Sequence, residues 1–385
     1  MGLALPARFL QLTRGIGGTA RRHRVSPIAV LDRVLRLWAG KGIRPRETLM
    51  AGLADPAVSE RALSGCLSKP RLQHLQERLN PPGLECLLKD KSVFYPYVMA
   101  LGLPVPRLHA VFDVLGGWSP QGAIPSGDRE WEVFFRDRLP AEFVIKPAWG
   151  IYGEGFQIFT REGDRFVDLS GRTWSAPELV VSLRSHRSYR RWVIQARVRN
   201  HPELERLSGT TFLQTVRIMT FVDGAGQARA YAPHLKLIGA DAVVDNIQGG
   251  RVGNFPAAIG LEDGALRAGR IFDADGTGMT TLTSHPRTGV RLEGFELPGW
   301  PEVLPLVERA ARLFVPIRTI GWDLALTGTG PVIVEGNMWW DPPNDLASAR
   351  PDAADPHGMP ALLDLLRAEA ARPLRPGRGY RTDRL

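Results

Sequence analysis

Residues 320–345 have the sequence IGWDLALTGTGPVIVEGNMWWDPPND, and this stretch defines the chemistry and fold class of the chain. Two short apolar runs, 321–327 and 331–335, stand on either side of Gly-Thr-Gly at 328–330. Short apolar runs bounded by glycine turns are typical of strands, so we predict two strands joined by a tight turn. If they pair antiparallel, the start of the first strand lies beside the end of the second.

Three oxygen-bearing side chains would meet in this hairpin. Asp323 would lie opposite the end that carries Glu335 and Asn337, and the Glu-x-Asn spacing puts both of these side chains on one face. Mg²⁺ prefers such hard oxygen ligands and keeps water or nucleotide phosphate in its other positions. The alternative is a hairpin with ordinary polar ends. Glu335 directly follows the apolar run PVIV, where a buried carboxylate needs a partner, and this favours a metal site.

A second motif is EFVIKPAWGIYGEGFQIF at 142–159. A buried strand ends with Lys146, and a loop containing Gly150, Gly153 and Gly155 leads into a further apolar strand. Lysine supplies a point charge for phosphate, and glycines let backbone N–H groups approach an anion. The loop is neither a P-loop nor a dinucleotide-binding fingerprint, because it lacks the first pattern and enters a strand rather than a helix. A glycine-rich hairpin alone is a weak signal, but together with the acidic hairpin it indicates nucleotide binding.

The rest of the chain predicts a mixed α+β protein. Expected helices cover short stretches of 47–91, then a helix ending near 101–102, and 129–139, 304–314 and 362–371. Expected strands cover 107–112, 142–146, 192–199 and 215–222, with antiparallel strands within 223–298. No internal repeat or heptad pattern is present.

Composition and charge limit the function classes. Of 385 residues, 44% are hydrophobic and 23% charged, as in a globular protein with a large core. We expect neither a membrane-spanning helix nor a signal peptide, and two cysteines favour a reducing cytoplasm. The net charge of +9 is concentrated at the ends: residues 1–46 carry +9 and 372–385 carry +4, which leaves −4 for 47–371. A mildly acidic body argues against nucleic-acid binding.

The basic N-terminal segment contains one well-marked helix. Ser26 is a plausible N-cap, Pro27 suits the first turn and Gly40 the C-cap. An apolar stripe runs along this helix, formed by Ile28, Leu31, Val34, Leu35 and Trp38. We expect the stripe to pack onto the body of the protein. The alternative is that the basic arm makes peripheral contact with an anionic membrane surface, at its inner face, or with an acidic partner.

A series of motifs in this order resembles the ATP-grasp superfamily, most closely its sugar-transfer-associated branch, which is related to α-L-glutamate ligase-like proteins. The motifs are Lys91 before a helix and LGLPVP, VIKPAWGIYGEG, WVIQARV, TVRIMTF, DNIQGG, and Asp323 with Glu335-Gly-Asn337. The resemblance covers about 85–355. It implies an ATP-grasp fold in which two α+β subdomains clasp the nucleotide. The expected regions are a basic helical arm at 1–46, an N-terminal helical and α/β region at 47–140, a nucleotide-lid subdomain at 141–200, a catalytic subdomain at 201–371 and a basic tail at 372–385.

The resemblance also implies roles for individual residues. Lys91 and Lys146 would hold the ATP phosphates under a mobile loop with Gly150, Gly153 and Gly155. The adenine would bind the hinge formed by Gln195, Ala196, Arg197 and Val198, and Glu203 would hold the ribose. Asp323, Glu335 and Asn337 would bind Mg²⁺, as two ions, a role that Mn²⁺ can also fill. Arg217, Asn246 and Arg251 would face the transferred phosphate and the acceptor.

The implied reaction is carboxylate activation by ATP followed by attack of an amine, with small, sugar-linked molecules in polysaccharide or cell-surface glycan biosynthesis as substrates. A kinase that phosphorylates a hydroxyl with the same site, and a non-catalytic binding protein, are the alternatives. Some relatives carry an arginine two residues before the metal aspartate, where this chain has Gly321. Lys236 and His285 could contact substrate, but we expect a solvated strand residue and a turn residue. We expect Trp339 and Trp340 to pack rather than to stack on sugars.

Overall fold

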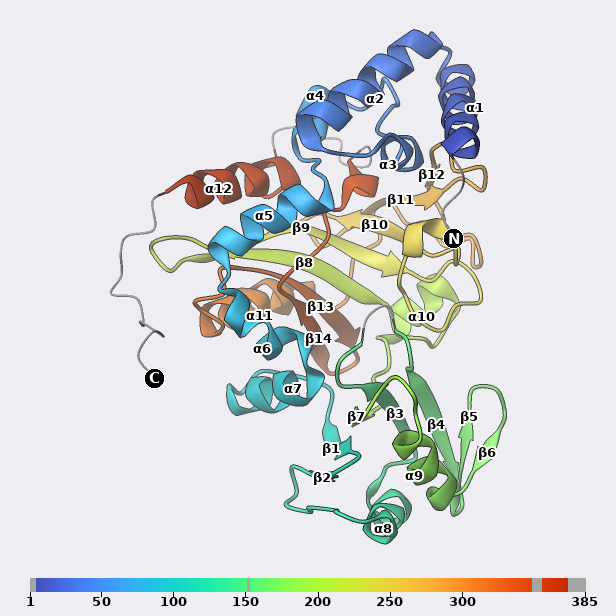
Figure 1. Cartoon of the computed structure of the whole chain (residues 1–385), viewed down its shortest axis with the longest axis vertical. Coiled ribbons are helices and arrows are strands. Elements are labelled where there is room, and N and C mark those ends of the chain that lie inside the picture. Colours follow the sequence, from blue (N-terminus) through green and yellow to red (C-terminus); the bar gives the residue numbers. More distant parts are fainter. Residues whose placement is uncertain (1–4, 151–152, 348–354, 373–385) are drawn as a thin grey trace.

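The hairpin expected at 321–335 forms as two paired strands, β13 (Thr319–Thr327) and β14 (Gly330–Asn337) (Figure 1). The computed structural model describes residues 5–150, 153–347 and 355–372. In β13 and β14, Asp323 lies opposite Glu335 and Gly321 opposite Asn337, so the predicted antiparallel pairing is confirmed. The α+β architecture is confirmed as well, because the described residues form two antiparallel sheets and many helices.

The larger sheet has the strand order β12-β11-β10-β9-β8-β13-β14. Its other strands are β8 (Thr215–Val222), β9 (Ala228–Leu237), β10 (Phe255–Ile259), β11 (Leu266–Phe272) and β12 (Met279–Leu282). Alternate residues of β8 pack on opposite faces, because strand side chains alternate. Val216 and Ile218 join the core under α11 (Trp300–Leu313), whereas Met219 and Phe221 join a core with α5 (Lys69–Leu79) and α12 (Met359–Ala371). Helices therefore cover both faces of this sheet.

The smaller sheet has the order β2-β1-β7-β3-β4-β5-β6. Its strands are β1 (Leu108–Asp113), β2 (Gly116–Trp118), β3 (Glu142–Pro147), β4 (Gln157–Glu162), β5 (Arg165–Asp168), β6 (Thr173–Trp174) and β7 (Arg191–Ala196). Helices α8 (Asp128–Arg138) and α9 (Ala176–Arg184) pack on it over a core rich in aromatic side chains. Two of its strands, β1 and β2, precede residue 141, at which we expected the nucleotide-lid subdomain to begin. The chain enters this sheet from α7 (Lys91–Ala100) and leaves it before α10 (Pro202–Ser208).

The N-terminal region is helical, as expected, and connects to the larger sheet at two places. Its helices are α1 (Leu5–His23), α2 (Pro27–Lys41), α3 (Pro45–Met50), α4 (Glu60–Ser64), α5 and α6 (Cys86–Lys89). Thr19 of α1 donates to the carbonyl of Thr277 beside β12, at 3.0 Å. At the C-terminal end of α5, the side-chain amide of Asn80 donates to the carbonyls of Thr319 and Met338, at 2.9 and 3.2 Å. The helices thereby brace the hairpin that carries Asp323 and Glu335.

Helix α2 corrects two expectations. Its Ser26 N-cap accepts from the Ala29 amide as expected, but the helix ends at Gly42, with a left-handed φ of 72°, rather than at Gly40. Glycine adopts this conformation without steric cost. The apolar stripe does not pack onto the body either: α2 packs through Val30, Val34 and Leu37, and the rest of the stripe faces outward. None of the helices described is both long and apolar enough to cross a membrane.

Candidate functional site

A cavity of about 340 Å³ lies between the two sheets. Most of the predicted site residues line it: Lys91, Lys146, Gly150, Gly153, Gln195, Ala196, Arg197, Val198, Arg217, Asn246, Asp323, Glu335 and Asn337. They come from helix α7, from β3 and β7 of the smaller sheet, from β8, β13 and β14 of the larger sheet, and from the connections between elements. The cavity thus brings most of the separate motifs of the sequence together.

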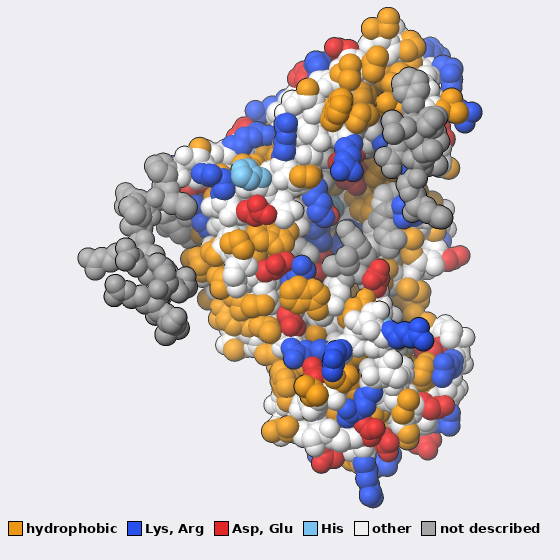
Figure 2. Space-filling view, viewed as in Figure 1, with side chains coloured by type: hydrophobic (Ala, Val, Ile, Leu, Met, Phe, Trp, Pro, Cys, Tyr) orange, Lys and Arg blue, Asp and Glu red, His pale blue; other side chains and the backbone are white. Residues whose placement is uncertain are grey.

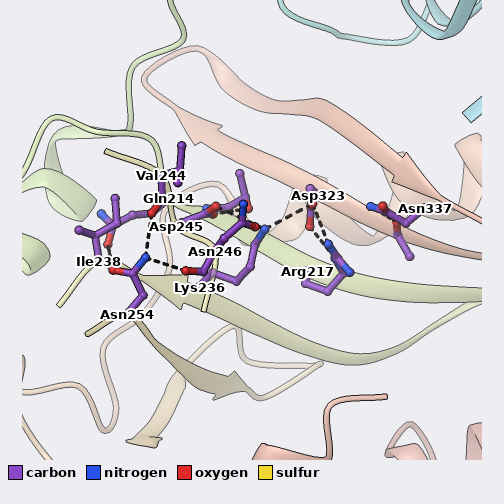
Figure 3. Close-up of polar contacts among 12 residues, drawn as sticks. Gln214, Arg217, Lys236, Ile238, Val244, Asp245, Asn246, Asn254, Asp323 and Asn337 are labelled. Atoms are coloured by element: carbon purple, nitrogen blue, oxygen red, sulfur yellow. Dashed lines mark hydrogen bonds and ion pairs between the residues drawn. The ribbon is translucent and has the colours of Figure 1, made fainter. Parts of the chain in front are cut away.

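The carboxylate of Asp323 is held by two cations (Figure 3). Arg217 lies directly opposite Asp323 on the neighbouring strand β8 and donates to both of its oxygens, Nε to Oδ1 at 2.5 Å and Nη2 to Oδ2 at 2.8 Å. The ammonium of Lys236 on β9 lies 3.3 Å from Oδ2. Burial opposes ionisation of Asp323, but the charges of Arg217 and Lys236 hold its pKa well below its ordinary value. Asp323 is therefore a carboxylate at neutral pH.

Lys236 is fixed from its other side by a second carboxylate. Its Nζ lies 3.5 Å from Oδ1 of Asp245, and Oδ2 of Asp245 accepts from the backbone N–H and the hydroxyl of Thr215, at 2.8 and 2.5 Å. Asn254 donates to the carbonyl of Asn246, the next residue along, at 3.0 Å. These bonds hold the DNIQGG segment against the sheet. The expectation that Lys236 is a solvated strand residue is wrong, because its side chain is buried between two aspartates.

Glu335 differs from Asp323 because its carboxylate is free. It forms no hydrogen bond or ion pair with any described residue, although it lies opposite Asp323 in the sheet. The amide of Asn337 donates to the carbonyl of Gly321 at 3.3 Å, which leaves its oxygen available on the same face. A free carboxylate, an amide oxygen and a second carboxylate form an oxygen donor set that fits Mg²⁺. With only two carboxylates this set is smaller than a cluster of three His, Cys, Asp or Glu, and no such cluster occurs anywhere among the residues that the structure describes.

Two lysines, Lys91 and Lys146, line another part of the cavity. Nζ of Lys146, at the end of β3, donates to the hydroxyl of Tyr95 at 2.6 Å, and this hydroxyl donates to the carbonyl of Val334 at 2.7 Å. Burial and the nearby charge of Lys91 lower the pKa of Lys146 to about 7, against a smaller opposing effect of Glu335. Lys91, the first residue of α7, donates to the carbonyl of Gly150 at 3.5 Å. Of the predicted loop 150–155, residues 151 and 152 lie outside the described part.

The end of β7 and the connection after it offer unpaired polar groups beside an apolar wall. The side-chain amide of Gln195 is buried, and neither its Oε1 nor its Nε2 hydrogen-bonds another described residue. The backbone N–H and C=O of Val198 likewise have no partner in the described ranges. Arg197 points away to Glu142, at 2.9 Å. Val144, Ile158, Phe212 and Leu213 line the cavity nearby. An aromatic ring with polar edges, such as a nucleobase, suits this combination.

Three predicted residues do not line the cavity. Gly155 packs on Pro147 and Tyr189, and Arg251 is exposed. Glu203 is exposed on α10 and pairs with Arg206 at 2.7 Å. His285, a turn residue as expected, is buried and bonds to the carbonyl of Ile238 at 3.2 Å, outside the cavity lining.

Other lining residues were not predicted to belong to the site. Thr215 and Asp245 anchor Lys236, and Lys69 of α5 reaches the cavity, where it pairs with Asp341 at 2.7 Å. Lys69 lies in the N-terminal region that carries none of the motifs. A lysine inside the apolar strand PHLKLIG was the one available signal for Lys236, because a buried cation requires a partner.

Trp340 explains why residue 321 is glycine. A Cβ on Gly321 would lie 2.7 Å from the Cβ of Trp340, whose indole N–H bonds to the hydroxyl of Thr319 at 3.1 Å. Trp340 is buried, as the packing interpretation requires, and Trp339 is half-buried; both line the cavity. Trp340 therefore leaves no room for a side chain at 321, and the guanidinium beside Asp323 belongs to Arg217 on β8.

Comparison with known proteins gives one match by sequence family. Residues 71–348 match the family model described as sugar-transfer associated ATP-grasp. No curated protein matches the chain.

Solved structures resemble it at low identity. They include the D-alanine-D-alanine ligase from Coxiella burnetii (13% identity, 74% of this chain and 57% of that chain, TM-score 0.38) and D-alanyl-alanine synthetase A from Vibrio cholerae (10%, 74% and 66%, 0.41). A third is the biotin carboxylase complex with β,γ-ATP from Campylobacter jejuni (10%, 75% and 47%, 0.41). This chain thus spans little more than half of the first of these ligases.

Proposed function

The chain belongs to the sugar-transfer associated ATP-grasp family, and from this premise we propose that it is a Mg·ATP-dependent ligase that joins a carboxylate to an amine. We place its substrates among small, sugar-linked molecules of polysaccharide or cell-surface glycan biosynthesis in the cytoplasm. The observation that carries the proposal is the set of charged residues that line one cavity: the lysines Lys91 and Lys146 together with Asp323 and the free carboxylate of Glu335.

These residues and their neighbours in the cavity could bind a nucleotide. The apolar wall and the unpaired groups of Gln195 and Val198 would receive the base. The phosphates would then extend toward Lys146 and Lys91, whose charges oppose theirs. Asp323, Glu335 and Asn337 would hold Mg²⁺, which supplies charge neutralisation at the phosphates.

In the reaction, a carboxylate oxygen of the donor attacks the γ-phosphorus of ATP, which gives an acylphosphate and releases ADP. An amine then attacks the carbonyl carbon, phosphate leaves, and an amide and a proton are formed. Arg217 is the guanidinium placed to bind the carboxylate and to stabilise negative charge on the carbonyl oxygen. Its ion pair with Asp323 fixes its position before substrates bind. No serine or cysteine nucleophile is required.

The test is release of ADP and phosphate by the full chain with Mg·ATP, in the presence of pools of amino acids, uronic acids, amino sugars and nucleotide sugars. Mass spectrometry of each active pool identifies the product. A condensed product together with free phosphate supports the ligase. A phosphorylated product without free phosphate would show a kinase instead, and failure to bind ATP at all would overturn the nucleotide site.

A further inference from the structure

Helix α2 has two apolar faces, and only one of them is buried. Val30, Val34 and Leu37 are buried against the neighbouring helices. On the outer side, four large apolar side chains are exposed: Ile28 (78%), Leu31 (40%), Leu35 (45%) and Trp38 (54%). Their spacing of three, four and three residues places them in one continuous stripe. We call these four residues the outer stripe.

The outer stripe lies at one end of the molecule. Figure 1 shows α1 and α2 projecting beyond the larger sheet, and Figure 2 shows hydrophobic side chains gathered at that end with basic side chains beside them. Such a patch costs solvation free energy unless something covers it, because isolated apolar residues are common on surfaces but contiguous stripes are not. No described segment of this chain covers the outer stripe.

Unpaired positive charge surrounds the same helices. Arg14, Arg21, Arg24, Arg44 and Arg46 are exposed and form no ion pair with any residue in the described ranges. By contrast, Arg22 pairs with Asp273, and Arg36 pairs with Asp32 and Glu60. Because residues 47–371 carry −4, these arginines make the α1–α2 end the positive end of an otherwise acidic body. The partner of this end is therefore both anionic and able to accept apolar side chains.

We propose that the α1–α2 end docks on an anionic lipid bilayer, with α2 lying in the plane of the interface. Trp38, Leu31 and Leu35 would enter the boundary between headgroups and acyl chains, where tryptophan and leucine are favoured on interfacial helices. The unpaired arginines would contact lipid phosphates. A nucleic acid would neutralise the arginines but would offer no apolar environment for the outer stripe. This proposal stands independently of the ligase assignment, since it uses no residue of the cavity.

Cosedimentation of the full chain with vesicles tests it. Wild type should bind vesicles of phosphatidylcholine with phosphatidylglycerol, should bind pure phosphatidylcholine far less, and should lose affinity with added salt. The variant Leu35→Ser/Trp38→Ser should bind at least about tenfold more weakly. The matched control Leu115→Ser/Ile124→Ser, at exposed apolar positions near β2 (87% and 76% exposed), should bind like wild type.

A charge variant measures the contribution of the arginines separately from that of the outer stripe. Arg21→Gln/Arg24→Gln should weaken binding to anionic vesicles by about fivefold for each arginine. All variants should keep the wild-type melting temperature within a few degrees, because the positions are exposed. Equal binding to both lipids, absence of binding, or unchanged binding of the outer-stripe variant would overturn the proposal. Concentration-dependent dimerisation that disappears in Leu35→Ser/Trp38→Ser, without lipid binding, would assign the outer stripe to a second copy of the chain.

Discussion

Arg217 and Asp323 face each other across neighbouring strands and form a two-pronged ion pair, with Nε–Oδ1 at 2.5 Å and Nη2–Oδ2 at 2.8 Å. The pair connects two predicted roles, because Arg217 is assigned to the acceptor and Asp323 to the metal. Lys236 completes the cluster from β9. The residues that would handle phosphate, metal and carboxylate are thus already oriented by one another in the protein alone.

Replacing only one partner of this ion pair should lower the free energy of unfolding more than replacing both partners. Arg217→Met leaves a buried carboxylate with Lys236 as its remaining cation, and we expect a loss of about 3 kcal/mol in the free energy of unfolding. Arg217→Met/Asp323→Asn should lose less than the sum of the two single variants, because it leaves no uncompensated charge on either partner. Urea unfolding of the four proteins measures the coupling. Strict additivity would show that the ion pair contributes nothing.

Glu335 should matter for Mg²⁺ and little for folding. Since its carboxylate has no partner among the described residues, Glu335→Ala should change the free energy of unfolding by less than about 1 kcal/mol. The same variant should abolish Mg·ATP turnover and remove the Mg²⁺ dependence of ATP affinity in calorimetry. Glu262→Ala, at an exposed acidic position, is the matched control and should keep both properties. Unchanged Mg²⁺ dependence in Glu335→Ala would refute the metal assignment.

Gly321 should tolerate no side chain. Gly321→Ala places a Cβ 2.7 Å from the Cβ of Trp340, an atom that moves only with the backbone, so we expect a loss of about 1–3 kcal/mol in unfolding free energy. Gly328→Ala, in the hairpin turn with open space around it, is the matched control and should change stability by less than about 0.5 kcal/mol. If thermal melts show the two variants to be equally stable, Trp340 does not exclude a side chain at 321.

Much of the site could be predicted because its parts are local in sequence. The turn at 328–330 predicted that Asp323 lies beside the end of the strand that carries Glu335, and it does. A β-bulge between Asp323 and Leu324 shifts the register, so the exact pairing of Asp323 with Glu335 required the structure. The strand TVRIMTFV was predicted at 215–222 and forms there. Its neighbour in the sheet is β13, far along the chain, and neither strand contains a signal for that pairing. The contact between Arg217 and Asp323 could therefore be recognised only from the strand order of the folded sheet.

The remaining differences come from packing that one sequence does not specify. Helix α2 has apolar residues around most of its circumference, so its pattern could not tell which face would be buried, and the outer stripe was assigned to the wrong side. Lys236 stands in an apolar strand, and its two aspartate partners lie on other segments of the larger sheet and its connections. Lys69 reaches the cavity from a helix whose own sequence carries no site motif.

Lys146 should make stability and nucleotide binding depend on pH. Burial and Lys91 lower its pKa from 10.5 to about 7, so between these values the unfolded chain binds more protons than the folded protein. The free energy of unfolding should therefore rise with pH across this window, by up to roughly 1.4 kcal/mol per pH unit, and Lys146→Met should flatten the rise. Lys89→Met, which removes a surface partner of Glu85, should keep the wild-type slope.

ATP phosphates favour the charged form of Lys146, so ATP binding at pH 8 should take up a proton. Calorimetry in buffers of different ionisation enthalpy measures this uptake. A wild-type slope in Lys146→Met, with no proton uptake on binding in the wild-type protein, would show that Lys146 stays charged in the absence of ATP.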